Sequence, residues 1–127
     1  MPDLSDLIGV RFLVHGRDKS RGYDCYGLAI EVSLRFGHIL PDLWYKRSDS
    51  ATFNNNAEGV LSTLAESVVE TEIEEEGNLV VFFEGNKMTH IGVILDEDTF
   101  IHCDKFGVRI MRLSEYYRQK RRIYRWV

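Results

Sequence analysis

A cysteine at the start of an apolar run is the residue of this sequence best suited to chemistry. Cys25 lies in the stretch Gly-Tyr-Asp-Cys-Tyr-Gly-Leu-Ala, and the apolar run that follows it reaches Phe36 and ends at Gly37. A glycine just past the last periodic residue is typical of a helix C-terminus, so we expect a helix over about residues 25–36. The free N–H groups and the positive dipole end of a helix lower the pKa of a thiol in its first turn. Cys25 is therefore a candidate nucleophile.

A nucleophilic thiol needs a base within hydrogen-bond reach and a third group that orients the base. His90 and His102 lie in neighbouring predicted strands, and a hairpin that turns at about Glu97 makes them cross-strand neighbours that can hydrogen-bond. Alternation places His90, Gly92 and Ile94 on one face of their strand. If that face meets the helix, the small Gly92 lets the helix approach and leaves room for a thiolate. The alternative is that both histidines are partly exposed strand residues without a catalytic role.

The second cysteine, Cys103, leaves other uses of sulfur open. On counting alone Cys25 and Cys103 form one disulfide, but a cysteine at a helix start with histidines elsewhere fits a catalytic thiol better. Zinc is disfavoured because His102 and Cys103 are adjacent on a strand and point to opposite faces, and Cys-x-x-Cys and His-x-x-x-His spacings are lacking. We therefore expect no metal site and no cofactor, with Cys103 as a buried small hydrophobe.

The elements that must position these residues come as helices first and strands second. Residues 3–8 look like a short helix or an irregular lead-in, residues 9–22 like a loop, and residues 57–67 like a second helix. Strands follow over residues 79–83, 90–95, 99–103, 108–113 and 122–127, with tight links that favour an antiparallel meander. This order predicts one domain over residues 1–127 with an α+β fold, in which N-terminal helices pack on a C-terminal antiparallel sheet of about five strands.

Charge and hydropathy exclude several classes of protein. A net charge of −4 argues against nucleic-acid binding, and no apolar run is long enough for a membrane span. The first six residues are acidic where a signal peptide is basic, so we expect synthesis in the cytoplasm, without a signal peptide. An acidic stretch over residues 66–76 and a basic one over residues 118–125 are interpreted as solvated faces, complementary within the fold or between subunits.

Five short motifs, in order along nearly the whole chain, resemble those of the NlpC-type cysteine peptidases. These are bacterial and phage enzymes that cut peptidoglycan stem peptides on a pared-down papain-like fold. The motifs are Asp24-Cys25-Tyr26-Gly27-Leu28 for the family's Asp-Cys-Ser-Gly-Leu, Leu40-Pro41 after the helix, Gly77-Asn78-Leu79-Val80 for Gly-Asp-Leu-Val, His90-Ile91-Gly92-Val93 for His-Val-Gly-Ile, and Phe100-Ile101-His102 for Phe-Ile-His.

The resemblance implies a catalytic triad. Cys25 would be the nucleophile, His90 the base, and His102 the polar residue that orients the imidazole of His90. Backbone N–H groups near Cys25 would hold the oxyanion, because a helix start offers such donors.

The resemblance also implies a substrate-binding set made of Phe12, Asp24, Tyr26 and Gly92. Two of these residues depart from the family pattern. Phe12 stands where the family often has a tyrosine that lines the oxyanion side, and Tyr26 replaces a small residue beside the nucleophile. These departures bear on how the substrate is positioned and leave the triad intact.

The function implied by the resemblance is hydrolysis of an amide bond in peptidoglycan stem peptides, with the γ-D-glutamyl to diamino acid bond as the expected target. The segments His-Gly-Arg-Asp, Tyr-Asp-Cys-Tyr-Gly-Leu and Ile-Leu-Pro-Asp are similar to the branch of the family found in tails of phages and prophages. Other tail proteins are then expected partners. The alternatives are a structural tail component with little hydrolytic activity, and a related amide hydrolase or acyltransferase that uses the same triad on another substrate.

Overall fold

The chain folds as one α-helix packed on an antiparallel sheet within the part that the computed structural model describes, which is residues 1–42, 55–56, 64–116 and 120–127. The helix α1 spans Cys25–Arg35, and two short 3₁₀ helices span Ser5–Leu7 (η1) and Leu113–Glu115 (η2). The predicted α+β class is confirmed. None of the helices in the described ranges has the length and apolar character that crossing a bilayer requires.

The sheet orders its strands as β4-β9-β5-β6-β7-β8, and all of these neighbours are antiparallel. Their bounds are Val68–Thr71 (β4), Leu79–Glu84 (β5), Lys87–Asp96 (β6), Thr99–Asp104 (β7), Gly107–Arg112 (β8) and Lys120–Trp126 (β9). Short strands add to this frame: β1 (Arg17–Asp18) pairs with β2 (Gly22–Tyr23), and β3 (Asn55–Asn56) pairs with β6.

The strands from β5 to β9 are the five that the sequence predicts, and β5 to β8 form the expected meander. The strand β4 was not predicted as one. The predicted second helix falls largely on residues 57–63, which lie outside the described residues.

The helix α1 is fixed at both ends by its own sequence. Asp24 is the N-cap, and its side chain accepts a hydrogen bond from the N–H of Gly27 at 2.7 Å. At the other end the N–H of Gly37 donates to the carbonyl of Leu34 and the N–H of His38 donates to that of Ser33, both at 2.9 Å. With Gly37 at φ +90°, this is a Schellman motif.

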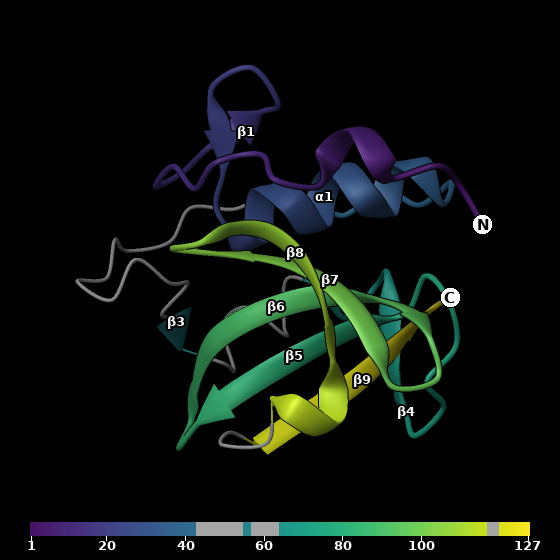
Figure 1. The fold of residues 1–127 in the computed structure, drawn as a ribbon. Helices are drawn as coiled ribbons and strands as arrows, with labels where there is room; N and C mark the ends of the chain where they lie inside the picture. The colour runs from purple at the N-terminus through teal and green to yellow at the C-terminus, as the bar shows by residue number, and fades with distance from the viewer. Residues whose placement is uncertain (43–54, 57–63, 117–119) are drawn as a thin grey trace.

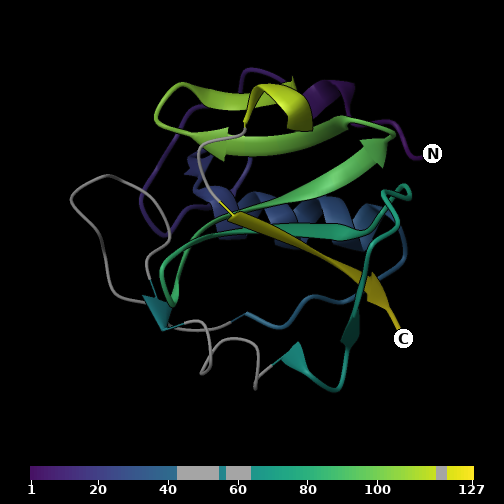
Figure 2. The same ribbon diagram turned by 90° about the horizontal axis from the view of Figure 1, so that it is seen from below.

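Two apolar cores lie on opposite faces of the sheet. The first lies between α1 and the sheet (Figure 2) and includes Cys25, Ala29 and Val32 of the helix, each no more than 2% exposed. The second core lies on the other face, where η2 covers it. It contains Val80, Phe82, Ile94, Phe100, Leu113 and Ile123, with Met111 and Tyr116 packed against it.

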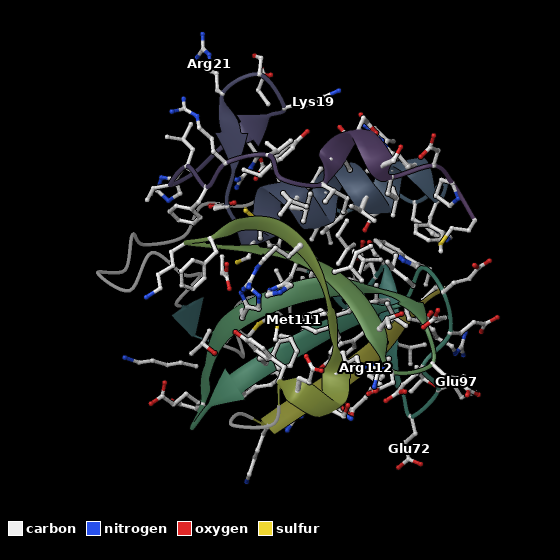
Figure 3. All side chains as sticks on the ribbon, viewed as in Figure 1. Lys19, Arg21, Glu72, Glu97, Met111 and Arg112 are labelled. Carbon is white, nitrogen blue, oxygen red and sulfur yellow. The ribbon has the colours of Figure 1, made fainter. Side chains whose placement is uncertain are left out.

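The acidic and basic stretches of the sequence meet within the fold. The acidic stretch contains β4, which pairs with the basic strand β9. Glu74 in this stretch forms an ion pair with Arg121 of β9, with 3.5 Å between nitrogen and oxygen. One ion pair thus joins the two stretches within the fold, and their complementarity between subunits stays a prediction. Figure 3 shows Lys19 and Arg21 extending from the β1–β2 hairpin, and Glu72, Glu97 and Arg112 at the far end of the molecule.

Gly27 in the first turn of α1 allows the chain before β1 to lie directly on the helix. A Cβ at Gly27 would stand 2.0 Å from the carbonyl oxygen of Gly16, which is backbone and cannot swing away. The absence of a side chain at this position therefore sets how closely the β1–β2 hairpin packs beside the start of α1 (Figure 1).

We expect Gly27→Ala to lower the free energy of unfolding by about 1–3 kcal/mol, although alanine is the better helix former, because overpacking against a backbone carbonyl outweighs helix propensity. Urea denaturation measures the change.

Ser33→Ala in the same helix is the control for this prediction. The hydroxyl of Ser33 is buried without a hydrogen-bond partner, so its removal should leave stability unchanged or raise it by about 0.5–1 kcal/mol. An equal loss in both variants would contradict the close-approach explanation.

Candidate active site

Cys25 is the first residue of α1, as the sequence predicts, and it is 2% exposed. The backbone around it is held by Asp24, whose second carboxylate oxygen accepts the N–H of His15 at 3.1 Å while the first accepts that of Gly27. The thiol thus lies at the N-terminal end of the helix dipole, where a thiolate is stabilised.

Asp24 is also tied to strand β1. Arg17 donates to the Asp24 carboxylate at 2.8 Å and to the carbonyl of Gly16 at 2.9 Å, and it pairs with Asp42 at 3.1 Å. Asp24 itself is only 4% exposed. Its carboxylate therefore serves the helix start and the ion pair with Arg17, which is a different role from the substrate contact that the sequence predicts.

Tyr26 is the next residue along α1. It is fully buried, and its hydroxyl donates to the carbonyl of Pro41 at 2.5 Å. The guanidinium of Arg17 lies 5.8 Å from the centre of its ring. The side chain attaches the start of α1 to the segment that follows the helix, and the expectation that Tyr26 contacts the substrate stays a prediction.

Phe12 and Gly92 complete the predicted substrate set. Phe12 pairs with Tyr23 through a parallel bridge, and its half-buried ring packs against the core that contains Cys25. Gly92 is buried, and a Cβ there would stand 2.7 Å from the ring of Phe100. The small residue therefore makes room for Phe100, and the expectation that it lets the helix approach is wrong.

The helix packs against the other face of β6. Ile91 and Val93 share the first core with α1, whereas Ile94 belongs to the second core. Because β6 is buried on both faces, alternation along its sequence does not reveal which face meets the helix.

The structure brings His90 and His102 together. The Nε2 atom of His90 lies 2.7 Å from the Nδ1 atom of His102, and the two rings are nearly perpendicular at 87°. The residues are 1% and 0% exposed, which excludes the alternative of partly exposed strand histidines. The predicted cross-strand contact is confirmed, with the β6–β7 register of Ile94 opposite Phe100 and Val93 opposite Ile101.

A β-bulge sets the face on which His90 lies. The register of β5 and β6 shifts between Phe82, which pairs with His90, and Phe83, which pairs with Met88. Met88 therefore lies in the first core, whereas His90 faces Phe82 on the second side of the sheet. Without the bulge, Met88 and His90 would share a face.

One ring nitrogen of each imidazole has no hydrogen-bond partner. The Nδ1 atom of His90 and the Nε2 atom of His102 are buried and have no hydrogen-bond partner. The Nδ1 atom of His90 therefore remains available to accept a proton, and the expectation that Cys25 lies within hydrogen-bond reach of His90 stays a prediction. Catalytic hydrogen bonds are often long or poorly aligned until substrate binds.

Cys103 connects the helix start to the strand that carries His102. Its thiol donates to the carbonyl of Tyr23 at 3.1 Å, two residues before Cys25. Both cysteines are free, so the disulfide is excluded, and burial raises the pKa of the Cys103 thiol to about 12. Cys103 is the buried small residue that the sequence predicts.

Tyr116 was missed by the sequence analysis. It lies just after η2, and its ring centre is 5.5 Å from that of His90 and 5.6 Å from that of His102. Burial raises the pKa of its hydroxyl, and electrostatic interactions with Asp104 and Cys25 add to the rise. Cys25 therefore lies within electrostatic range of the residue that covers both histidines.

Both histidines are neutral at neutral pH. Burial lowers the pKa of His90 well below its usual value, helped by the positive forms of His102 and Arg109. Burial likewise lowers the pKa of His102 to about 4, where Arg109 lowers it further and Asp104 opposes the shift. With neutral rings, the contact between them carries a single proton, and one orientation of that proton leaves the Nδ1 atom of His90 as a free base.

The depressed pKa values predict a loss of stability in mild acid. Below pH 6.5 the unfolded chain binds protons at these histidines that the folded chain does not bind, so the free energy of unfolding falls until the folded-state pKa of about 4 is reached for His102. Each histidine contributes at most about 1.4 kcal/mol per pH unit in this window.

Urea denaturation between pH 7 and pH 4 measures this loss. In His102→Asn the free energy of unfolding should fall less steeply with decreasing pH, by roughly the contribution of one proton, because asparagine does not titrate. An unchanged slope in the variant would show that His102 is not buried as a neutral base.

Among the described residues no group of three or more His, Cys, Asp or Glu side chains is placed to hold a metal ion.

Comparisons with known proteins find similarity over most of this chain. The chain is 28% identical over 124 residues to the murein DD-endopeptidase MepS/murein LD-carboxypeptidase of Escherichia coli strains K12, O6:H1 and O157:H7, which covers 95% of this chain and 57% of each relative. It thus spans little more than half the length of these curated relatives. The NlpC/P60 family model matches residues 9–127, and the chain belongs to the NlpC/P60 family.

Proposed function

We propose that this chain is a cysteine peptidase that hydrolyses an amide bond in peptidoglycan stem peptides. Cys25 is the nucleophile, His90 the base, and His102 the residue that orients His90. The observation that carries the proposal is the buried contact between the two histidines, which leaves the Nδ1 atom of His90 open. Membership of the NlpC/P60 family supports the reaction class.

The proposed reaction proceeds through an acyl-enzyme. The thiol proton of Cys25 passes to the Nδ1 atom of His90, and the sulfur attacks the carbonyl carbon of the scissile amide. Backbone N–H groups at the start of α1 stabilise the oxygen that becomes negative. His90 then gives its proton to the leaving amine, and a water molecule, activated by His90, releases the acyl group from Cys25.

The substrate is proposed from the relatives. Their printed names describe murein DD-endopeptidase and LD-carboxypeptidase activities, and this chain covers 57% of their length. We propose the γ-D-glutamyl to diamino acid bond as the first candidate, with the DD and LD bonds as the others. All three are amides of stem peptides, so the products of digestion distinguish them.

Association with a phage or prophage tail is a further proposal, and it rests on motif similarity alone. With it we propose that the protein is synthesised in the cytoplasm and contacts other tail proteins. The curated relatives are Escherichia coli wall enzymes, which do not support the tail association.

Purified peptidoglycan sacculi test the reaction directly, with soluble products identified by mass spectrometry. The native protein should release stem-peptide fragments, and Cys25→Ala should release none. His90→Asn should lower the rate by about 10²–10⁴-fold, the usual contribution of a general base.

Cys103→Ser is the matched control for loss of a thiol, since serine keeps a donor for the carbonyl of Tyr23. It should retain activity. Release of the same fragments by Cys25→Ala would refute the proposed nucleophile. No release by the native protein from several wall types would refute the substrate and favour another amide or a structural tail role.

A further inference from the structure

Tyr116 forms one wall of the compartment that contains the histidine pair. Besides both imidazoles, its ring contacts Phe82 with the centres 4.6 Å apart and Phe100 with the centres 5.7 Å apart. Phe82 and Phe100 in turn lie 5.8 Å from His90 and 4.6 Å from His102. The two histidines are thus enclosed by three aromatic rings, of which Tyr116 is the only one from outside the strands that carry or flank them.

The enclosure matters because one ring nitrogen of each histidine has no hydrogen-bond partner. A buried ring nitrogen without a partner gains a hydrogen bond if water reaches it, and water that binds there competes with the contact between the histidines. The second core excludes water on the side of Phe100, which is fully buried. Tyr116 is half-buried and closes the same compartment toward solvent.

The charged groups around Tyr116 come from several elements. Cys25 at the start of α1 and Asp104 at the end of β7 raise the pKa of its hydroxyl, and Arg109 on β8 lowers it. Arg109 is the β8 residue opposite His102 and donates to Asp104 at 2.6 Å, so the two charges are paired beside the histidines. Tyr116 therefore lies between this ion pair, the histidine pair and the proposed nucleophile.

We infer that Tyr116 is a positioning residue of the proposed peptidase, whose ring keeps water out of the contact between His90 and His102 and holds the two imidazoles together. The inference rests on the proposed function, and it acts through the histidines rather than through the substrate. Its consequence is that the ring, and not the hydroxyl, keeps both histidines neutral in mild acid.

The experiment is an NMR titration of the imidazole ring protons of His90 and His102 in four proteins. These are the native protein, Tyr116→Phe, which keeps the ring, Tyr116→Ala, which removes it, and Leu113→Ala. Leu113 belongs to the same core and the adjoining short helix, so this variant controls for a general loss of packing. Tyr116→Leu replaces Tyr116→Ala if the alanine variant does not fold.

Loss of the ring should move the titration of both histidines to higher pH, whereas Tyr116→Phe and Leu113→Ala should titrate like the native protein. On sacculi, Tyr116→Ala should lower kcat/KM about tenfold and move the acid limb of its pH profile to higher pH, because an aromatic contact of this kind is worth roughly that factor.

Unchanged histidine titration in Tyr116→Ala, or an equal shift in Leu113→Ala, would overturn the inference. The titration needs no substrate. A native protein that does not digest sacculi but shows the ring-dependent shift would refute the proposed substrate and retain the positioning role.

Discussion

The contact between His90 and His102 is the interaction on which the chemistry of this protein depends. It joins two rings that are both buried and both neutral, so each ring can be held only by its partner and by the apolar surfaces around it. The sheet provides this arrangement through the β6–β7 register and through the bulge that turns His90 toward Phe82. Burial strengthens the hydrogen bond between the rings. It also means that a ring nitrogen without a hydrogen-bond partner lowers the stability of the fold, which is consistent with a catalytic use of that nitrogen.

Contacts from β1 and from β7 hold the start of α1 in place. Asp24 caps the helix and binds Arg17. Gly27 has no side chain, so the backbone of Gly16 can lie against it. The thiol of Cys103 donates a hydrogen bond to the carbonyl of Tyr23. These contacts use groups that are individually ordinary. Together they restrict where the thiol of Cys25 can lie relative to the strand that carries His102, which is the precondition for a thiol and an imidazole to act as one group.

Much of this arrangement could be predicted from the sequence, because the signals are local. The helix from Cys25 follows from periodicity, its cap and its terminal glycine, and the strands β5 to β9 follow from β-branched runs between turn residues. The histidine contact follows from the hairpin register, since the residues that pair across β6 and β7 are set by where the chain turns.

The remainder depends on packing that no local pattern encodes. Strand β6 is apolar on both faces, so the sequence alone does not show that Gly92 accommodates Phe100 and does not face the helix. Tyr26 carries a hydroxyl whose partner, Pro41, is remote in sequence, and its burial could not be inferred from its position beside Cys25. Tyr116 reaches the histidines from an irregular segment, where spacing predicts no direction for a side chain.

The pH dependence of Cys25 alkylation, compared between the native protein and a folded His90→Asn variant, tests most directly whether the thiol and the imidazole form one reactive pair. Cys25 is 2% exposed, so the reaction reports both access and thiolate formation, with Cys25→Ala as the blank for Cys103. The account predicts rapid alkylation at neutral pH in the native protein and, in His90→Asn, a rate that rises only near the ordinary thiol pKa of about 8.5. Identical profiles in the two proteins, or a Cys25 that does not react at any pH at which the chain is folded, would contradict it.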